Sequence, residues 1–188
     1  MWMWGVLLGS WAVLWLLLRL WYAHRLKKLQ SRLDEYQQLA SLDPLTGIPN
    51  RRAYEVHLAA LAKNEASVCL VSLDLNGLKA VNDAEGHDQG DALLRRAARI
   101  MQDCCPNEAA VYRVGGDEFM VLVEGLGPRQ AGSLVTRLEE ELQAAQVDIA
   151  CGMAYTPSGQ GADFKNLRRS SDQAMYQRKQ RQKQEHTG

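Results

Sequence analysis

The chain has 188 residues, enough for one globular domain and a short additional segment. Its 22 basic residues balance its 22 acidic residues, so the net charge gives no indication of a nucleic-acid partner. The cysteines show no Cys-x-x-Cys spacing and no histidine at a zinc-ligand spacing, so we expect reduced, mostly buried thiols and no disulfide framework. They are Cys69, Cys104, Cys105 and Cys151.

The first 23 residues are predicted to form a transmembrane helix. No charged residue occurs from Met1 to Leu18, a stretch about 27 Å long as a helix, and all five tryptophans lie within residues 1–23. A cleaved signal peptide would need a basic start and a small-residue cleavage site, and a buried core helix is the other alternative. Because basic residues follow the apolar stretch and none precedes it, the positive-inside rule predicts that the rest of the chain is cytoplasmic.

Residues 24–40 are predicted to form an amphipathic linker helix. Its apolar positions are separated by alternating steps of three and four: Leu26, Leu29, Leu33, Tyr36 and Ala40. This spacing is typical of a coiled coil, although it covers fewer than three heptads. Two interpretations stay open, a parallel dimer stalk and a helix that packs on its own domain.

From residue 41 to residue 183 the pattern is that of a mixed α+β domain, and residues 184–188 read as a tail. A turn cluster at 43–50 precedes a helix that Asn50 can cap, and the nearly continuous apolar run 67–75 is typical of a strand buried on both faces. Gly90 and Asp91 are expected to open a helix. The runs 110–114 and 118–124, separated by glycines, indicate a hairpin.

A helix beginning at Pro128, a strand at 148–155 and a final helix at 162–180 complete the expected elements. The resulting βαββαβ core predicts a sheet that contains antiparallel strands, with helices packed on one face, as in ferredoxin-like folds.

Three acidic residues are candidates for chemistry. Asp74 lies at the end of the buried strand, and Asp117 and Glu118 lie at the exit of the hairpin turn Gly115-Gly116. If the two strands are neighbours, Asp74 and Asp117 converge, and adjacent carboxylates repel unless a cation lies between them. Mg²⁺ prefers such oxygen ligands and commonly joins them to substrate phosphates. The alternative is that Asp74 caps a strand end and that Asp117 and Glu118 belong to a solvated turn.

Five segments together resemble the GGDEF family, the diguanylate cyclases. In chain order they are DPLTGIPNRR (43–52), DLNGLKAVND (74–83), GHDQGD (86–91), GGDEF (115–119) and SDQAMYQRK (171–179). The resemblance covers residues 43 to about 183, and its specificity comes from the order of all five segments. It implies a palm-like fold related to nucleotidyl cyclases and polymerases. It also implies the reaction of two GTP molecules to cyclic di-GMP and two pyrophosphates. In this family cyclic di-GMP is a bacterial second messenger that controls biofilm formation and motility.

The resemblance also implies roles for individual residues. Asp74, Asp117 and the backbone carbonyl of Leu75 would hold two Mg²⁺, with Mn²⁺ as a substitute, and Glu118 would support the same site. Asn82 and Asp91 would read the guanine edge; Asp91 taken alone could equally be a helix N-cap. The remaining phosphate contacts would be the backbone amides of Gly77 and Leu78 and the side chains of Lys79, Lys179 and Lys183. The alternative for the last two is a solvated basic tail.

The sequence departs from the family pattern in four places. Asn76 stands where Asp is frequent, and Gln182-Lys183-Gln184 replaces a Gly-Arg-Asn stretch. The segment before Asp148 is about ten residues shorter than usual. Pro106 and Ala109 occupy the Arg and Asp positions of the family's inhibitory Arg-x-x-Asp site, so product inhibition is expected to be weak or to use another surface.

One domain holds one GTP, so catalysis by the family requires a homodimer, which the linker helix could promote. The expected protein is a diguanylate cyclase anchored by one helix in the bacterial inner membrane. The alternatives are a catalytically inactive module that binds GTP or partner proteins, and a membrane scaffold that uses the fold without nucleotide.

Overall fold

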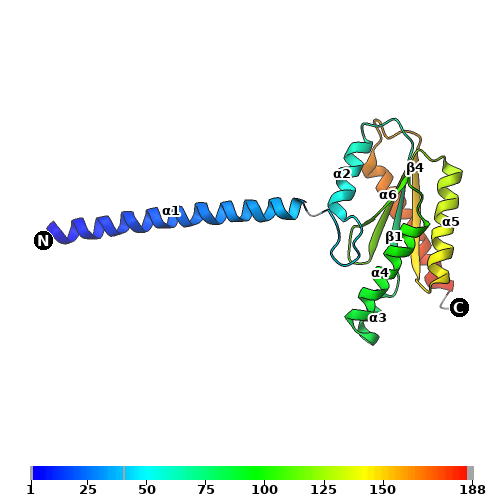
Figure 1. Ribbon diagram of the computed structural model, residues 1–188, viewed down its shortest axis with the longest axis horizontal. Helices are drawn as coiled ribbons and strands as arrows, with labels where there is room; N and C mark the ends of the chain where they lie inside the picture. Colours follow the sequence, from blue (N-terminus) through cyan, green and yellow to red (C-terminus); the bar gives the residue numbers. More distant parts are fainter. Residues whose placement is uncertain (1, 40, 186–188) are drawn as a thin grey trace. The chain divides into compact units, whose positions relative to one another are not determined.

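The computed structural model describes the backbone of residues 2–39 and 41–185. Within these ranges the side chains of residues 2–10, 12–14, 33–35, 37–39, 183 and 185 lie outside the description. The chain forms two compact units, residues 1–40 and 41–188, and each is described by itself. Figure 1 gives the order of the elements.

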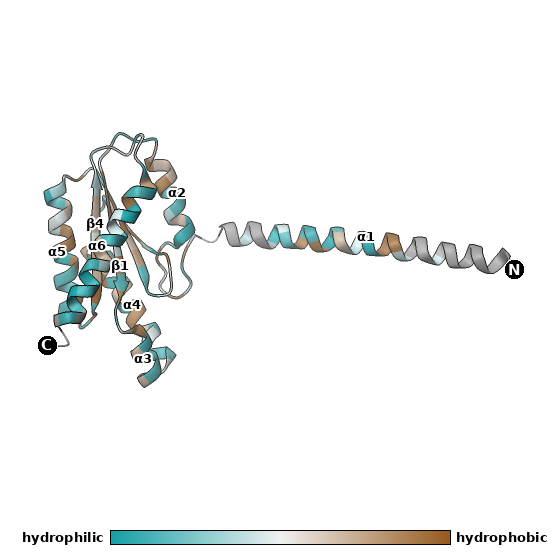
Figure 2. Cartoon of the chain, turned by 180° about the vertical axis from the view of Figure 1, so that it is seen from behind, coloured by the Kyte–Doolittle hydropathy of each residue, from teal (hydrophilic) through white to brown (hydrophobic). Residues whose placement is uncertain are grey.

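The first unit contains one helix, α1 (Trp2–Leu39), which runs through both the predicted membrane span and the predicted linker. Among the side chains that the structure describes, several large apolar ones on this helix are exposed: Trp11, Trp15, Leu16, Leu17, Leu18, Leu20 and Trp21. Figure 2 colours the described residues of α1 by hydropathy. Within the described residues, no helix has the length and apolarity required to cross a membrane. The transmembrane prediction is therefore unsupported there, and the side chains of residues 1–10 and 12–14 of the predicted span lie outside the description.

The second unit is built on a four-stranded sheet in which every pair of neighbours is antiparallel. The strands are β1 (Val68–Leu75), β2 (Ala109–Arg113), β3 (Glu118–Glu124) and β4 (Ile149–Thr156), in the order β2-β3-β1-β4. This confirms the predicted βαββαβ core with its hairpin. It also makes β1 and β3 direct neighbours, the condition on which the convergence of Asp74 and Asp117 depended.

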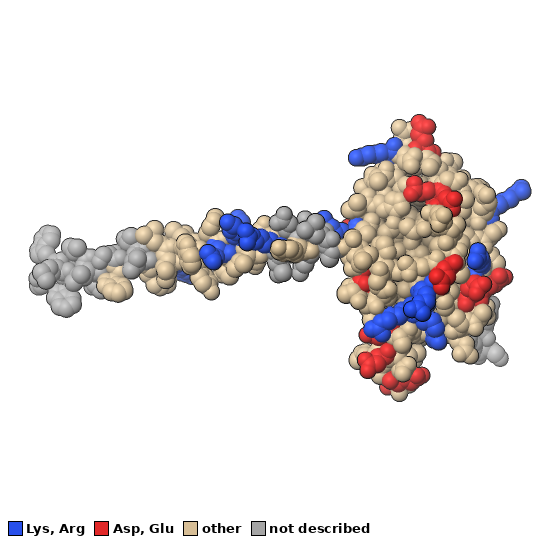
Figure 3. Space-filling model, viewed as in Figure 1, with Lys and Arg blue, Asp and Glu red and all other residues tan. Residues whose placement is uncertain are grey.

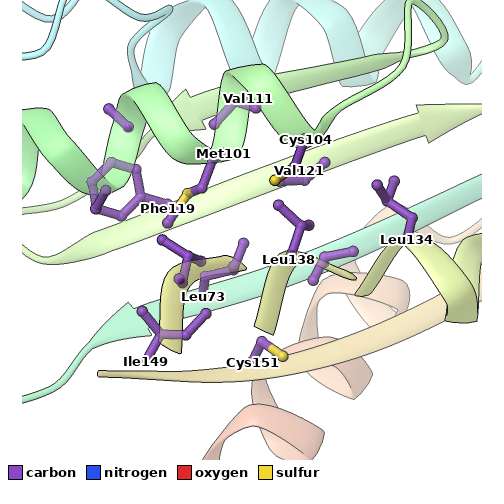
Figure 4. Close-up of a cluster of buried hydrophobic side chains, with 14 of the residues drawn as sticks. Leu73, Met101, Cys104, Val111, Phe119, Val121, Leu134, Leu138, Ile149 and Cys151 are labelled. Atoms are coloured by element: carbon purple, nitrogen blue, oxygen red, sulfur yellow. The ribbon is translucent and has the colours of Figure 1, made fainter. Parts of the chain in front are cut away.

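The helices of the βαββαβ core pack on one face of the sheet, as expected, and helices outside this core cover the other face. The two crossover helices, α4 (His87–Cys104) and α5 (Pro128–Ala144), cover one face and enclose the larger core (Figure 4). The other face is covered by α2 (Arg51–Leu61) and α6 (Phe164–Glu185), which pack on Leu70 and Leu122. The physical reason lies in β1, whose successive residues are apolar on both sides and need cover on both.

Local signals mostly place the element boundaries correctly. The side chain of Asn50 accepts hydrogen bonds from the backbone N–H groups of Arg52 and Ala53, as expected of an N-cap, and α5 begins at Pro128. The short helix α3 (Leu78–Glu85) was missed, and α4 begins at His87, earlier than the predicted Gly90-Asp91.

The four cysteines are free thiols, as predicted. Burial raises the pKa of Cys69 to about 12, so this thiol stays protonated at neutral pH.

Candidate active site

The register of the sheet brings the signature acids to the end of β1. Asp74 pairs directly with Glu118 across the antiparallel β1–β3 ladder. The backbone N–H of Leu75 donates to the carbonyl oxygen of Asp117 at 2.9 Å, which continues the ladder by one residue. Asp117 therefore lies opposite Leu75 and diagonal to Asp74, so the backbones of the two predicted metal ligands are neighbours at this end of the sheet, while the direct cross-strand partner of Asp74 is Glu118.

The turn between β2 and β3 depends on the small size of Gly115. A Cβ atom there would lie 2.6 Å from Oε2 of Glu118, a distance that real Cβ contacts do not reach. The N–H groups of Val114 and Gly115 both donate to the carbonyl of Glu118, and this closes the turn. Arg51 flanks it, with its Nε donating to the carbonyl of Val114 at 2.7 Å and its guanidinium 3.9 Å from Glu118.

A largely buried ion pair supports the same turn. Arg113 donates to the carbonyl of Gly116 at 2.7 Å and to Oδ1 of Asp43 at 2.9 Å, and the side chains of Arg113 and Asp43 are only 11% and 18% exposed. Burial alone would raise the pKa of Asp43, but hydrogen bonds from Thr46 and Arg113 outweigh it and hold the pKa below its usual value. Sequence reasoning missed Arg113, because its carboxylate partner Asp43 is 70 residues away in the sequence.

The basic end of α6 reaches the same acids. Nζ of Lys179 lies 2.5 Å from Oδ1 of Asp74, so this lysine contacts a predicted metal ligand. The resemblance predicts that Lys179 binds a phosphate of the nucleotide. In the structure its ammonium group instead contacts the carboxylate of Asp74. A position next to Asp74 still allows it to contact a phosphate bound there. The side chain of Lys183 lies outside the described residues.

The oxygen atoms at this end of the sheet fit a divalent cation. The available donors are the carboxylates of Asp74 and Asp117 and the carbonyl of Leu75, which are ligands of the kind that Mg²⁺ prefers. Within the described part of the chain, no three His, Cys, Asp or Glu side chains gather closely enough to form a metal cage. Mg²⁺ commonly uses one or two protein carboxylates and completes its shell with water and substrate phosphates, so this donor set matches it.

Asn82 and Asp91 form a second part of the site, on α3 and α4. The side chain of Asn82 lies against Gly90, the residue before Asp91, where a Cβ atom would lie 1.9 Å from Oδ1 of Asn82. Asp91 lies inside α4, one turn after its start, so the alternative that it caps the helix is wrong. Its carboxylate is 3.8 Å from the guanidinium of Arg95. Figure 3 shows acidic side chains gathered at the end of the domain that carries α3.

The first turn of α3 offers backbone N–H groups between these two parts. Gly77 is the N-cap residue and has a φ of 71°, a conformation that glycine adopts without strain. The N–H groups at the start of a helix have no intrahelical partner and attract anions, and here they belong to Leu78 and Lys79. This geometry fits the predicted phosphate contacts of Gly77, Leu78 and Lys79.

Residues 40–185 match the family described as diguanylate cyclase, GGDEF domain, and the chain belongs to this family. It is 40% identical over 158 residues to a Streptomyces griseus protein described only as uncharacterized and lying in the hutH 5′ region, a match that covers 79% of this chain and 66% of that protein. It is 30% identical over 156 residues to the diguanylate cyclase DgcS of Shewanella oneidensis, covering 77% and 52%.

Solved structures show the same fold. The diguanylate cyclase SiaD of Pseudomonas aeruginosa, in complex with its activator SiaC, superposes with a TM-score of 0.68 and is 26% identical, with 84% of this chain and 69% of that chain covered. The chain spans less than two thirds of the length of the curated relatives named above. The description of the family and the name of DgcS both connect this domain with diguanylate cyclases.

Proposed function

We propose that the chain is an active diguanylate cyclase, which condenses two GTP molecules to cyclic di-GMP and two pyrophosphates. The observation that supports the proposal is the pairing of the end of β1 with the signature turn, in which Asp74 lies opposite Glu118 and the N–H of Leu75 donates to the carbonyl of Asp117. A solvated turn has no need of a second carboxylate on the neighbouring strand.

Each part of the site has a separate task in this reaction. Asp74, Asp117 and the Leu75 carbonyl would hold two Mg²⁺ or Mn²⁺ ions, which supply positive charge at the α-phosphate and favour the 3′-oxygen as nucleophile. Glu118 supports this site from the start of β3. The backbone N–H groups of Gly77 and Leu78 and the side chains of Lys79, Lys179 and Lys183 hold phosphate oxygens.

Asn82 and Asp91 select the base. A carboxylate accepts hydrogen bonds from the N1 and N2 donors of guanine, which adenine does not offer. Asn82 lies on α3 and Asp91 on α4, whereas the proposed metal ligands lie at the ends of β1 and β3.

Two domains must meet, because each holds one nucleotide, so the proposal includes a homodimer. Residues 24–39 of α1 are the candidate dimer stalk, and Leu26 and Leu29 are exposed on it. Cysteines substituted at these two positions should crosslink between chains in native membranes. Crosslinks formed only within one chain would contradict the stalk.

Membrane attachment through residues 1–23 is a further part of the proposal. Exposed Trp15 and Leu18 support it, since large apolar side chains on a helix bind lipid when nothing else covers them. The full chain should sediment with membranes and resist carbonate extraction, whereas a chain lacking residues 1–23 should be released.

Product inhibition through the family's Arg-x-x-Asp positions is not expected. Pro106 and Ala109 form the turn that enters β2, where the N–H of Ala109 donates to the carbonyl of Pro106, and neither side chain can bind a phosphate or a base edge. Addition of cyclic di-GMP should therefore leave the initial rate nearly unchanged.

The deciding experiment is product analysis by mass spectrometry. The purified full chain in detergent is incubated with GTP and Mg²⁺, next to its Asp74→Asn variant. Cyclic di-GMP from the parent and a strong loss in the variant would support the cyclase. A folded parent that binds GTP without forming product would instead favour the inactive nucleotide-binding module.

A further inference from the structure

Helix α6 packs across β4 and β1, and polar side chains join it to β1 and to the residue after β1 at three successive points. The hydroxyl of Ser72 lies 2.7 Å from that of Ser171 and donates to Asp172 at 2.6 Å, and Lys179 contacts Asp74. The third contact lies just beyond the strand, where Nδ2 of Asn76 is 3.3 Å from Oε1 of Gln182. Strand and helix thus advance together toward the candidate site.

The third contact belongs to a small polar cluster, Asn76, Asp148 and Gln182. Asn76 donates from its side chain to Oδ1 of Asp148 at 3.2 Å, and from its backbone to the carbonyl of Asp148 at 2.9 Å. Gln182 donates from Nε2 to the carbonyl of Ile149, the first residue of β4, at 2.8 Å. The cluster therefore joins the end of β1, the start of β4 and the last turns of α6.

The three members of this cluster coincide with three of the departures in the sequence. Asn76 is the neutral residue after β1, Gln182 lies in the altered basic end, and Asp148 is the last residue of the short connection between α5 and β4, residues 145–148. In the structure they form hydrogen bonds with one another, and the amide of Asn76 acts as the donor that an aspartate could not be.

We propose that Asn76 and Gln182 are positioning residues that hold the end of α6 against the sheet, so that Lys179 and Lys183 bind the terminal phosphates of the nucleotide. The inference rests on the proposed function for the identity of that nucleotide, GTP. The last turn of a helix frays when nothing fixes it. Gln182 lies three residues after Lys179 and directly before Lys183, so fixing it fixes the helical segment that carries both lysines.

An aspartate at position 76 should harm this chain, although aspartate is frequent there in the family. Asn76→Asp would remove both side-chain donors and place a carboxylate about 3 Å from that of Asp148. The second change Asp148→Asn would supply an amide donor from the other side and restore the bond between positions 76 and 148. Gln182→Ala tests the same contact without any change of charge, and Gln184→Ala, an exposed residue of the same helix, is the matched control.

The experiment measures binding to the full chain by calorimetry, with 3′-deoxy-GTP as the probe, because it lacks the 3′-oxygen and cannot condense. Asn76→Asp and Gln182→Ala should each weaken binding by about 3- to 10-fold, as expected for the loss of one or two hydrogen bonds. Gln184→Ala should bind like the parent, and the double variant should recover most of the affinity that Asn76→Asp loses. GMP, which has no terminal phosphates, should bind all variants within about 2-fold of the parent, since no hydrogen bond to it is lost.

Three results would overturn the inference: parent-like binding by Gln182→Ala, no recovery in the double variant, or an equal loss for GMP. A parent that fails to bind 3′-deoxy-GTP would overturn it as well. The two proposals fail separately, because the binding assay needs no turnover. A parent that binds but makes no cyclic di-GMP contradicts only the proposed function, and an active parent with unaffected variants contradicts only the positioning role.

Discussion

The two parts of the candidate site are constructed differently. The carboxylates Asp74 and Asp117 lie at the end of two paired strands, in a register set by backbone hydrogen bonds, and Arg113 ties the signature turn to Asp43. The base-reading part is carried by α3 and the start of α4. None of the eight residues of α3, all of which the structure describes, is buried.

This difference separates chemistry from recognition. Residues that bring metal and phosphate together must keep their relative positions during the reaction, and a sheet with a closed turn provides this. Residues that select a base need only the correct donors and acceptors, and a short helix between Gly77 and Gly86, with φ values of 71° and 88°, can supply them at the surface. We therefore expect substitutions at the sheet to affect turnover, and substitutions beside α3 to affect affinity for GTP.

The largest effect is expected for Asp117→Asn. The substitution keeps the shape of the side chain and removes a charged metal ligand, so the rate of cyclic di-GMP formation should fall by about 10³-fold, corresponding to several kcal/mol of lost charge stabilisation. Product formation is measured by mass spectrometry at saturating GTP. Glu65→Gln, which neutralises an exposed carboxylate before β1, should retain the parent rate. A loss of less than tenfold at Asp117 would contradict its role as a metal ligand.

A smaller effect, confined to binding, is expected for Gly90→Ala. The new methyl group would lie 1.9 Å from Oδ1 of Asn82, so the amide must move away from its place beside Gly90. The KM for GTP should rise about 10-fold, in line with the loss of one hydrogen bond to the base, while kcat changes little.

The matched control for this change is Gly132→Ala in α5. Its Cβ would meet no atom within 4 Å, so it should leave KM unchanged and slightly stabilise the helix. If Gly90→Ala lowered kcat and left KM unchanged, the separation of recognition from chemistry would not hold.

The sequence predicted those parts of the molecule that depend on local patterns. The apolar run of β1, the glycine turn before Glu118, the cap at Asn50 and the start at Pro128 all follow from neighbouring residues. Because β1 and β3 are neighbours in a βαββαβ sheet, the convergence of Asp74 and Asp117 could also be predicted. The helix α3 was missed because it is short and buries none of its described residues, so it shows no apolar periodicity.

The contacts that hold the site together could not be read from the sequence. Three side-chain contacts join residues that are far apart in the sequence. They are Arg113 with Asp43, Lys179 with Asp74 and Gln182 with Asn76, separated by 70, 105 and 106 residues. Each of these side chains has a simple alternative as an exposed polar residue. The tertiary structure decides whether such a side chain supports the site or is merely an exposed polar residue. The deciding features are the packing of α6 against β1 and the packing of the 43–50 turn against the β2–β3 hairpin.

The smallest effect is expected for Asp43, and it concerns how the free energy of unfolding depends on pH. The pKa of Asp43 is lower in the folded chain than its usual value, so its ionised form stabilises the fold above about pH 4, and this contribution is lost as pH falls through the lowered pKa. Asp43→Asn should cost about 1–3 kcal/mol at pH 7, the range for a hydrogen bond to a charged group. It should also make the free energy of unfolding less dependent on pH below about 4.

Urea unfolding of parent and variant at pH 7, 4 and 3 measures the loss of stability at pH 7 and the pH dependence of the free energy of unfolding. In the variant, Thr46 and Arg113 remain in place and can donate to the asparagine side chain. The same ion pair supports the carbonyl of Gly116, so the variant should lose turnover before it loses affinity for 3′-deoxy-GTP. A variant whose stability falls with acid as steeply as that of the parent would show that other carboxylates dominate. The signature turn would then be held by its own backbone hydrogen bonds, from Val114 and Gly115 to Glu118, and not by the contact with Asp43.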